Sequence, residues 1–280
     1  MEFIKTTDST TGEEVQLSFK DYGKGRPVVL IHGWPLSKEM WEYQIEDLVD
    51  AGLRVIKYDR RGFGKSSKPW NGYDYDSLTA DLNAIMEELD LKDAVLVGFS
   101  MGGGEAVRYL SKYGSARVSK LVLIGAVTPF LRNTDDNPEG VPGEVFEEIM
   151  KKLKKDRIAF LDDFGKMFFG VNLINHPVSS PLLDYYRMLA SVAAPRATQQ
   201  CALSFAGTDF RNDIKSITVP TLIIHGKDDQ TVPIKASSDR TTKMIPSAEY
   251  KIYDGAPHGL FYTHREKLNE DLISFCKANA

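Results

Sequence analysis

Short runs of apolar residues alternate along the chain with longer segments in which apolar residues recur every three or four positions. The short runs are typical of strands that are buried on both faces, and the longer segments are typical of helices with one apolar side. Strands are predicted at 15–22, 27–31, 54–59, 94–98, 120–126, 220–226 and 249–253, and helices at 38–49, 76–91, directly after residue 100, and from 264 or 265 to 277. This alternation predicts an α/β fold in which a mostly parallel central sheet carries helices on both faces.

Residues 128–195 break this alternation. Pro, Asn and Asp gather between Pro129 and Pro142, and the helical segments that follow are rich in aromatic residues, namely Phe146, Phe160, Phe164, Phe168, Phe169, Tyr185 and Tyr186. We expect 128–195 to form a small helical cap over the carboxyl ends of the strands, where α/β folds bind ligands. Residues 1–127 and 196–280 would then form the core. Some of the aromatic residues would pack the cap onto the core, and a minority would line a pocket.

The composition narrows the classes of function. The chain has 280 residues, of which 42% are hydrophobic and 26% charged, and its net charge of −4 comes with scattered Lys and Arg. Neither a nucleic-acid partner nor a membrane partner is indicated. The first eight residues are too polar for a signal peptide, and no apolar run approaches 18 residues, so a cytoplasmic protein is expected. Cys201 and Cys276 are far apart and imply neither a disulfide framework nor a zinc site.

Ser100 lies in the sequence Gly98-Phe99-Ser100-Met101-Gly102, between an apolar run and a helical pattern. A sharp turn from strand to helix would lift the serine hydroxyl clear of the sheet and bring positions 98 and 102 close together, which glycine allows because it lacks a Cβ. This context resembles the nucleophile elbow of the α/β-hydrolases. The alternative, a chance match in a loop, leaves the flanking strand and helix unexplained.

A serine nucleophile needs a base, and the base needs a carboxylate that orients it. In the α/β-hydrolase fold these residues follow the chain order serine, acid, histidine. His258 lies in the loop between the last predicted strand and the last helix, and is predicted as the base. The other histidines fit less well: His32 precedes the serine, His176 is in the cap, His225 is interpreted as a core residue, and His264 begins the final helix.

Two aspartates, Asp228 and Asp229, follow the strand at 220–226, where the acid is expected. Asp228 could instead form local turn hydrogen bonds or face water. We choose Asp229 because its spacing to Val232 and Pro233 resembles the Asp-x-x-Val-Pro pattern of related hydrolases.

Acyl transfer also requires donors for the oxyanion that develops on the substrate. The N–H of Met101 is expected at a helix N-terminus, where unpaired N–H groups and the helix dipole favour negative charge. The second donor is expected from the backbone of Trp34, in the loop after the strand at 27–31. The indole of Trp34 could be a core aromatic or a wall of the pocket, and both can hold.

Five stretches of the chain resemble the cofactor-free bacterial haloperoxidase, perhydrolase and aryl esterase group of the α/β-hydrolases. They are residues 28–35, 58–67, 98–104, 137–142 and 255–260. The resemblance implies a triad of Ser100, Asp229 and His258, an oxyanion hole formed by Trp34 and Met101, and no metal or haem. It implies an esterase that acts on small esters or carboxylic acids through an acyl-enzyme, with hydrogen peroxide as an acceptor beside water.

The same resemblance leaves the substrate open. A γ-lactamase or lactonase would use the same triad, and a non-catalytic binding protein on this fold is a further alternative. Substrate contacts are predicted at Trp34, Pro35 and Phe99. Pro35 resembles the perhydrolase-type members and restricts Trp34 to extended conformations, so that the Trp34 carbonyl could accept a hydrogen bond from peroxide. Alternatively, Pro35 only shapes the loop. The oligomeric state is open, with a homo-oligomer among the options.

Overall fold

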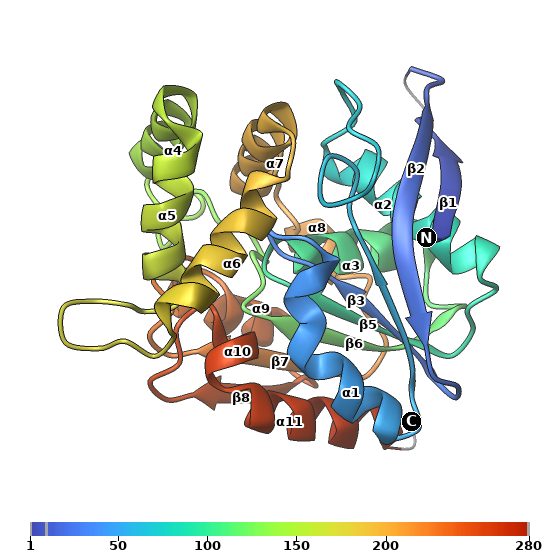
Figure 1. The fold of residues 1–280 in the computed structure, drawn as a ribbon. Coiled ribbons are helices and arrows are strands. Elements are labelled where there is room, and N and C mark those ends of the chain that lie inside the picture. The colour runs from blue at the N-terminus through green and yellow to red at the C-terminus, as the bar shows by residue number, and fades with distance from the viewer. Residues whose placement is uncertain (1, 9–10, 279–280) are drawn as a thin grey trace.

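The computed structural model describes residues 2–8 and 11–278 and centres on one eight-stranded sheet (Figure 1). The strand order is β1-β2-β4-β3-β5-β6-β7-β8. β2 pairs antiparallel with both β1 and β4, and the remaining pairs, from β4 across to β8, are parallel. The strands are β1 (Glu2–Thr7), β2 (Glu14–Tyr22), β3 (Pro27–Ile31), β4 (Arg54–Tyr58), β5 (Ala94–Phe99), β6 (Val118–Ile124), β7 (Thr221–Gly226) and β8 (Glu249–Tyr253).

Helices cover both faces of this sheet, and a separate group of helices stands at one end of it (Figure 1). α1 packs against α11 on one face, and α2 packs against α3 on the other. The core helices are η1 (Lys38–Trp41), α1 (Glu42–Asp50), α2 (Tyr75–Glu88), α3 (Met101–Tyr113), α8 (Arg211–Ile214), η2 (Ile234–Ala236), α9 (Ser238–Met244), α10 (Leu260–Thr263) and α11 (Arg265–Lys277). The separate group is α4 (Gly143–Lys155), α5 (Arg157–Phe168), α6 (Ser180–Ser191) and α7 (Pro195–Gly207). Within residues 2–8 and 11–278, none of the helices combines the length and the apolarity that crossing a membrane requires.

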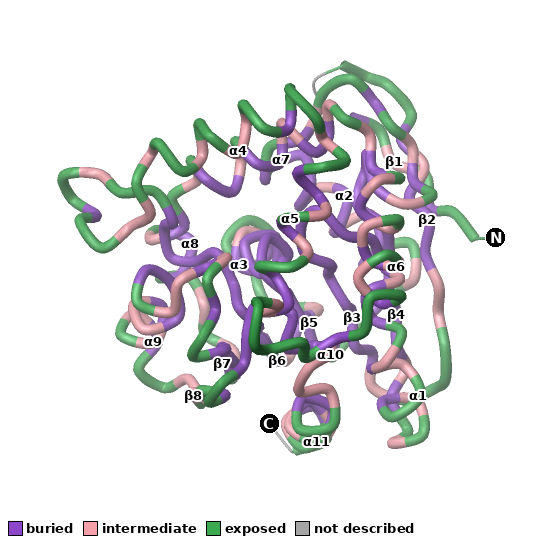
Figure 2. Tube along the Cα trace, turned by 60° about the vertical axis from the view of Figure 1, so that its left-hand side comes forward, coloured by how far each residue is buried: buried purple, intermediate pink, exposed green. Residues whose placement is uncertain are grey.

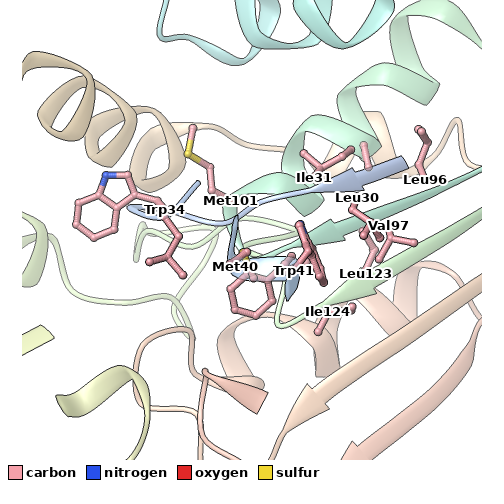
Figure 3. Packing of buried hydrophobic residues seen from close by; sticks show 14 of the residues in the cluster. Leu30, Ile31, Trp34, Met40, Trp41, Leu96, Val97, Met101, Leu123 and Ile124 are labelled. Carbon is pink, nitrogen blue, oxygen red and sulfur yellow. The ribbon is translucent and has the colours of Figure 1, made fainter. Parts of the chain in front are cut away.

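The central strands are short apolar runs because both of their faces are covered. Every residue of β3, β5 and β7 is buried, and the trace in Figure 2 is purple at the centre of the sheet and largely green along the outer helices. Side chains such as Leu30 of β3, Val97 of β5 and Leu123 of β6 belong to one core cluster (Figure 3). Burial of each such side chain contributes about 1.5–3 kcal/mol. The predicted α/β fold with a mostly parallel sheet is confirmed.

In the first fifty residues, two elements differ from the sequence-based expectation. β1 was not predicted; it is an edge strand that pairs with β2, and Ile4 is its one buried residue, so it has almost no apolar pattern. The helix expected over 38–49 is divided into η1 and α1, which meet between Trp41 and Glu42. The Ser37 side chain accepts a hydrogen bond from the Glu39 N–H and begins the first of these two helices.

Helices α4, α5 and α6 lie within the predicted cap, residues 128–195. Residues of α4 and α5 line a cavity together with Ser100, which follows β5, so this group of helices covers the carboxyl end of the sheet. α7 begins at Pro195 and contacts α4, so the helical group continues past the predicted boundary. The division of the chain into a core and a cap at 128–195 stays a prediction.

The backbone around Ser100 is packed too closely for any side chain at positions 98 and 102. A Cβ on Gly98 would lie 2.5 Å from the carbonyl oxygen of Gly102, and a Cβ on Gly102 would lie 2.5 Å from the carbonyl oxygen of Ile31. Gly103 is as tightly placed, because its Cβ would lie 2.5 Å from the Cβ of Ala126. The glycines therefore let α3 approach the sheet closely, which offsets their low helix propensity.

Replacement of Gly98 by alanine should destabilise the fold by about 3 kcal/mol or more, because backbone atoms cannot give way to the new methyl group. Gly165 is the matched control, since a Cβ there meets nothing within 4 Å in the middle of α5. Gly165→Ala should stabilise by about 0.5–1 kcal/mol. Urea unfolding of both variants measures the difference. A Gly98→Ala protein as stable as the wild type would contradict the packing described for the turn.

Candidate active site

Ser100 occupies a strained turn between β5 and α3. Its backbone has φ 54° and ψ −119°, a conformation that is rare for a residue with a side chain. The Ser100 N–H donates to the carbonyl of Ile124 at 2.8 Å, and the Ser100 carbonyl accepts from the N–H groups of Gly103 and Val127. These three hydrogen bonds fix the turn. Ser100 is only 5% exposed, and it borders a cavity.

A continuous hydrogen-bonded chain joins Ser100, His258 and Asp229. Ser100 Oγ lies 3.0 Å from His258 Nε2, and His258 Nδ1 lies 2.5 Å from Asp229 Oδ2. Since Asp229 accepts, Nδ1 carries the hydrogen, and Nε2 is left to accept from the serine hydroxyl. The ring of His258 packs against Phe99 and Phe168, with centroid distances of 4.8 and 4.9 Å. An imidazole placed in this way can remove the proton of Ser100.

Asp229 is buried, and both of its carboxylate oxygens accept hydrogen bonds. Oδ1 accepts from the N–H groups of Thr231 and Val232 at 2.9 and 2.8 Å, and Oδ2 accepts from His258. Burial by itself would raise the pKa of Asp229, but the imidazoles of His258 and His225 hold this pKa well below its usual range. The carboxylate therefore stays ionised. Asp228 is exposed, and of the two aspartates only Asp229 contacts His258.

The two expected oxyanion donors lie close to Ser100. Met101 is the first residue of α3, and Trp34 follows β3 in a loop so close to the turn that a Cβ on Gly33 would lie 3.1 Å from the Cβ of Ser100. In the part of the chain that the structure describes, neither the Met101 N–H nor the Trp34 N–H donates a hydrogen bond. Two unpaired amides beside a serine hydroxyl can bind an oxyanion.

The indole of Trp34 has both of the roles considered for it. Its Nε1–H donates to the carbonyl of Thr198 in α7 at 2.9 Å, and its ring packs against Phe160, Phe164 and Phe205 at 5.2–6.2 Å between centroids. The ring is also part of the wall of the cavity. The loop that presents the Trp34 amide is therefore anchored to the helices above it.

The cavity above Ser100 has a volume of about 520 Å³ and mostly apolar walls. Of the seven aromatic residues predicted in the cap, Phe146, Phe160 and Phe164 line it, which agrees with the expectation that a minority would do so. Besides Ser100, Gln230 and Thr231 are the uncharged polar residues of the lining. Charged side chains of α4 and α5 complete the lining, namely Glu144, Glu148, Lys152 and Asp163.

Two of the predicted substrate contacts, Phe99 and Pro35, lie outside the wall of the cavity that Ser100 borders. Phe99 is fully buried and is not among the cavity residues; its ring supports His258 and packs against Trp41. Successive side chains of a strand point to opposite faces, so the neighbour of Ser100 can point into the core. Pro35 follows a cis peptide bond and borders a separate cavity of about 20 Å³ beneath α5 and α6. Neither side chain lines the cavity that Ser100 borders.

A buried network behind the oxyanion loop was not predicted. Arg60 donates from Nη2 to the carbonyl of His32 at 2.7 Å and pairs with Glu105, which also accepts from Tyr58. His32 Nδ1 lies 2.8 Å from the carbonyl of Gly33, and Nε2 accepts from the Arg60 N–H. Burial, together with the charge of Arg60, holds the pKa of His32 well below its usual value, so this ring stays neutral. The network fixes the loop that precedes Trp34.

The interpretation of His225 as a core residue is confirmed, but the sequence did not predict that it contacts Asp229. The residue is fully buried, as a core histidine would be, but its Nε2 lies 3.2 Å from Asp229 Oδ2. The feature of the sequence that could have indicated this contact is the position of His225 at the end of a strand, four residues before Asp229.

The remaining candidates for chemistry that the sequence raised are metal ligands and the two cysteines. Among the residues that the structure describes, no three His, Cys, Asp or Glu side chains gather in a way that could hold a metal ion. Cys201 and Cys276 are free and buried, and burial raises the pKa of each thiol to about 12. Such thiols are weak nucleophiles at neutral pH.

The family described as the alpha/beta hydrolase fold matches residues 26–265, so the chain belongs to the α/β-hydrolase family. It is 41% identical to a non-heme chloroperoxidase of Kitasatospora aureofaciens, over 95% of this chain and 98% of that protein. It is 37% identical to a bifunctional esterase/perhydrolase of Acinetobacter calcoaceticus, over 96% and 99% of the two chains. A bromoperoxidase from Bacillus anthracis has the same fold in its crystal structure, with a TM-score of 0.94, 45% identity and coverage of 99% and 100%. The resemblance to the haloperoxidase and perhydrolase group is confirmed.

Asp229→Asn should lower ester turnover by about 10⁴, because an amide at this position favours the imidazole tautomer that cannot accept the serine proton. Asp228→Asn is the matched control one residue earlier, and should retain nearly full activity because Asp228 is exposed. Steady-state hydrolysis of p-nitrophenyl acetate by both variants measures the contrast. Equal losses, or a larger loss at Asp228, would show that the hydrogen bond to His258 does not identify the acid.

Proposed function

We propose that the protein is a serine esterase that also forms peracids, acting through an acyl-enzyme on Ser100. The observation that carries this proposal is the hydrogen-bonded chain of Ser100, His258 and buried, ionised Asp229, which opens onto an apolar cavity. The full-length similarity to a non-heme chloroperoxidase and to an esterase/perhydrolase supports both activities.

In the proposed reaction His258 takes the proton of the Ser100 hydroxyl while Ser100 Oγ attacks the carbonyl carbon of an ester. The amides of Trp34 and Met101 donate to the oxyanion that forms. Collapse of this intermediate breaks the bond to the alcohol oxygen, which receives the proton from His258. Water then attacks the acyl-enzyme and releases a carboxylic acid, or hydrogen peroxide attacks it and releases a peracid. A peracid that leaves the site can oxidise halide, so haloperoxidase activity would be secondary to acyl transfer.

The aromatic walls of the cavity support small esters with apolar or aryl groups as substrates. These walls, formed in part by Trp34, Phe160 and Phe164, suit an apolar acyl or alcohol group. A lactone or γ-lactam could react with the same residues, so a panel of p-nitrophenyl esters, lactones and a γ-lactam, each with and without peroxide, decides among them.

The proposal includes a cytoplasmic location and leaves the oligomeric state, monomer or homo-oligomer, to direct measurement.

Ser100→Ala should lower ester turnover by about 10⁴- to 10⁶-fold and leave the fold intact, because the variant keeps the cavity and loses the nucleophile. A serine-directed phosphonate should label the wild type and not the variant. Turnover, labelling and thermal unfolding are measured on the same preparations. A folded Ser100→Ala protein that still hydrolyses the ester would overturn the assignment of the nucleophile. A wild type that neither hydrolyses esters nor reacts with the phosphonate would favour a binding protein.

Pro35→Leu should lower peracid formation more than ester hydrolysis. Pro35 fixes its own φ near −65° and restricts the residue before it, so it sets the direction of the Trp34 carbonyl. No described residue donates to this carbonyl, which leaves it free to accept a hydrogen bond from peroxide. A preference of about 1.4 kcal/mol would change the ratio of products tenfold. Both kcat/KM values are measured on one acetate ester with peroxide varied; an unchanged ratio would mean that Pro35 only shapes the loop.

A further inference from the structure

The carboxylate of Asp229 contacts two imidazoles, and only one of them belongs to the proposed triad. Asp229 Oδ2 lies 2.5 Å from Nδ1 of His258 and 3.2 Å from Nε2 of His225. The second ring comes from the end of β7, whereas His258 comes from the loop after β8. Two strands that are neighbours in the sheet therefore each contribute an imidazole to the same oxygen.

The surroundings of His225 determine which of its nitrogens carries the hydrogen. Nε2 lies 2.9 Å from the carbonyl oxygen of Val232 and 3.2 Å from the Asp229 carboxylate, and both of these groups can only accept. Nε2 must therefore be protonated. Nδ1 lies 2.6 Å from Oγ of Ser238, a hydroxyl in α9 that can donate to it. A neutral His225 with its hydrogen on Nε2 satisfies every one of these contacts.

Together these donors fix the plane of the carboxylate. The amides of Thr231 and Val232 hold Oδ1, and the N–H of His258 donates to Oδ2. The N–H of His225, which donates to the Val232 carbonyl at 2.9 Å, also faces Oδ2, at 3.2 Å. Because Asp229, Val232 and the two imidazoles are buried, their contacts act in a low-dielectric environment and are stronger than they would be in water. Among the described residues, the two imidazoles are the titratable groups in contact with Asp229, and no Lys or Arg forms an ion pair with it.

We propose that His225 is a positioning residue for the acid: its Nε2–H holds Asp229 Oδ2 in place and withdraws part of the negative charge that His258 would otherwise meet. This inference rests on the proposed function, because it assigns His225 a role in the same acyl transfer. It goes beyond packing, since a histidine that only filled the core would leave the basicity of His258 unchanged. His225 thereby tunes the pH range in which the serine is activated.

The sign of the effect follows from the charge. Without the His225 donor, the carboxylate presents more negative charge to His258 and stabilises its protonated form. Since hydrolysis requires the neutral imidazole, the acid limb of the pH profile of kcat/KM should move to higher pH when the donor is removed. The bond between His258 Nδ1–H and Asp229 should also become stronger, which moves the proton resonance of that N–H further downfield.

Two substitutions at this position separate Nε2, which faces Asp229 and the Val232 carbonyl, from Nδ1, which faces Ser238. In His225→Asn the amide reaches about as far as Nδ1, so it can keep a bond to Ser238 but cannot reach Asp229. In His225→Gln the amide nitrogen reaches about as far as Nε2 and can donate to the carboxylate. His225→Asn should move the acid limb by about half a pH unit to higher pH. It should also lower the plateau of kcat/KM about tenfold, given the strength of a hydrogen bond to a charged group. His225→Gln should return both the acid limb and the plateau of kcat/KM most of the way to their wild-type values.

The proton resonance of His258 Nδ1–H is measured in the same variants and again with Ser100→Ala, where no turnover occurs. The resonance therefore tests the role of His225 even if no ester proves to be a substrate. In this way, failure of the proposed function can be distinguished from failure of this inference. Thermal unfolding identifies variants that do not fold. If His225→Asn does not fold, Ser238→Ala is measured in its place. Loss of the hydroxyl that holds His225 Nδ1 should move the His258 resonance in the same direction, by a smaller amount. A folded His225→Asn, or Ser238→Ala in its place, with an unchanged resonance and acid limb would overturn the proposal.

Discussion

An ionised carboxylate in the interior of the protein is the constraint on which the site depends. Taking Asp229 out of water is costly unless donors replace the lost hydration. Here the donors come from its own loop, from β7 and from the loop after β8, so these segments must meet for the carboxylate to be stable. The same arrangement leaves His258 with one free nitrogen, which is directed at Ser100. The hydrogen bonds that stabilise the buried carboxylate are therefore the same ones that orient His258 toward Ser100.

Much of the fold could be predicted because the parallel strands are buried on both faces and so appear as continuous apolar runs. β3 and β8 begin and end at the predicted residues, and β7 differs by one. β1 could not be predicted in this way, since an edge strand with Ile4 as its one buried residue has no such run. The extent of the cap is equally hard to define from sequence, because α7 is an amphipathic helix that could belong to either part of the chain.

The site was predictable where local sequence dictates geometry, and not where distant segments meet. The glycines around Ser100 and the loop position of His258 indicated the serine and histidine directly, and the structure adds the contact that separates Asp229 from Asp228. The contacts of Phe99 with His258 and Trp41 were not evident from the sequence, because these residues lie far from it along the chain. The partners of Arg60 lie 28 and 45 residues away, at His32 and Glu105, and no sequence pattern joins them.

The three residues of the proposed triad and the walls of the cavity come from different parts of the chain. Ser100, Asp229 and His258 stand on loops of the central sheet, whereas most of the aromatic and charged lining comes from α4, α5 and α7. α4 has Leu153 as its one buried residue, so most of its positions can change with little effect on the free energy of unfolding. A lineage of such proteins can therefore acquire new substrate preferences by drift in these helices while its chemistry stays the same.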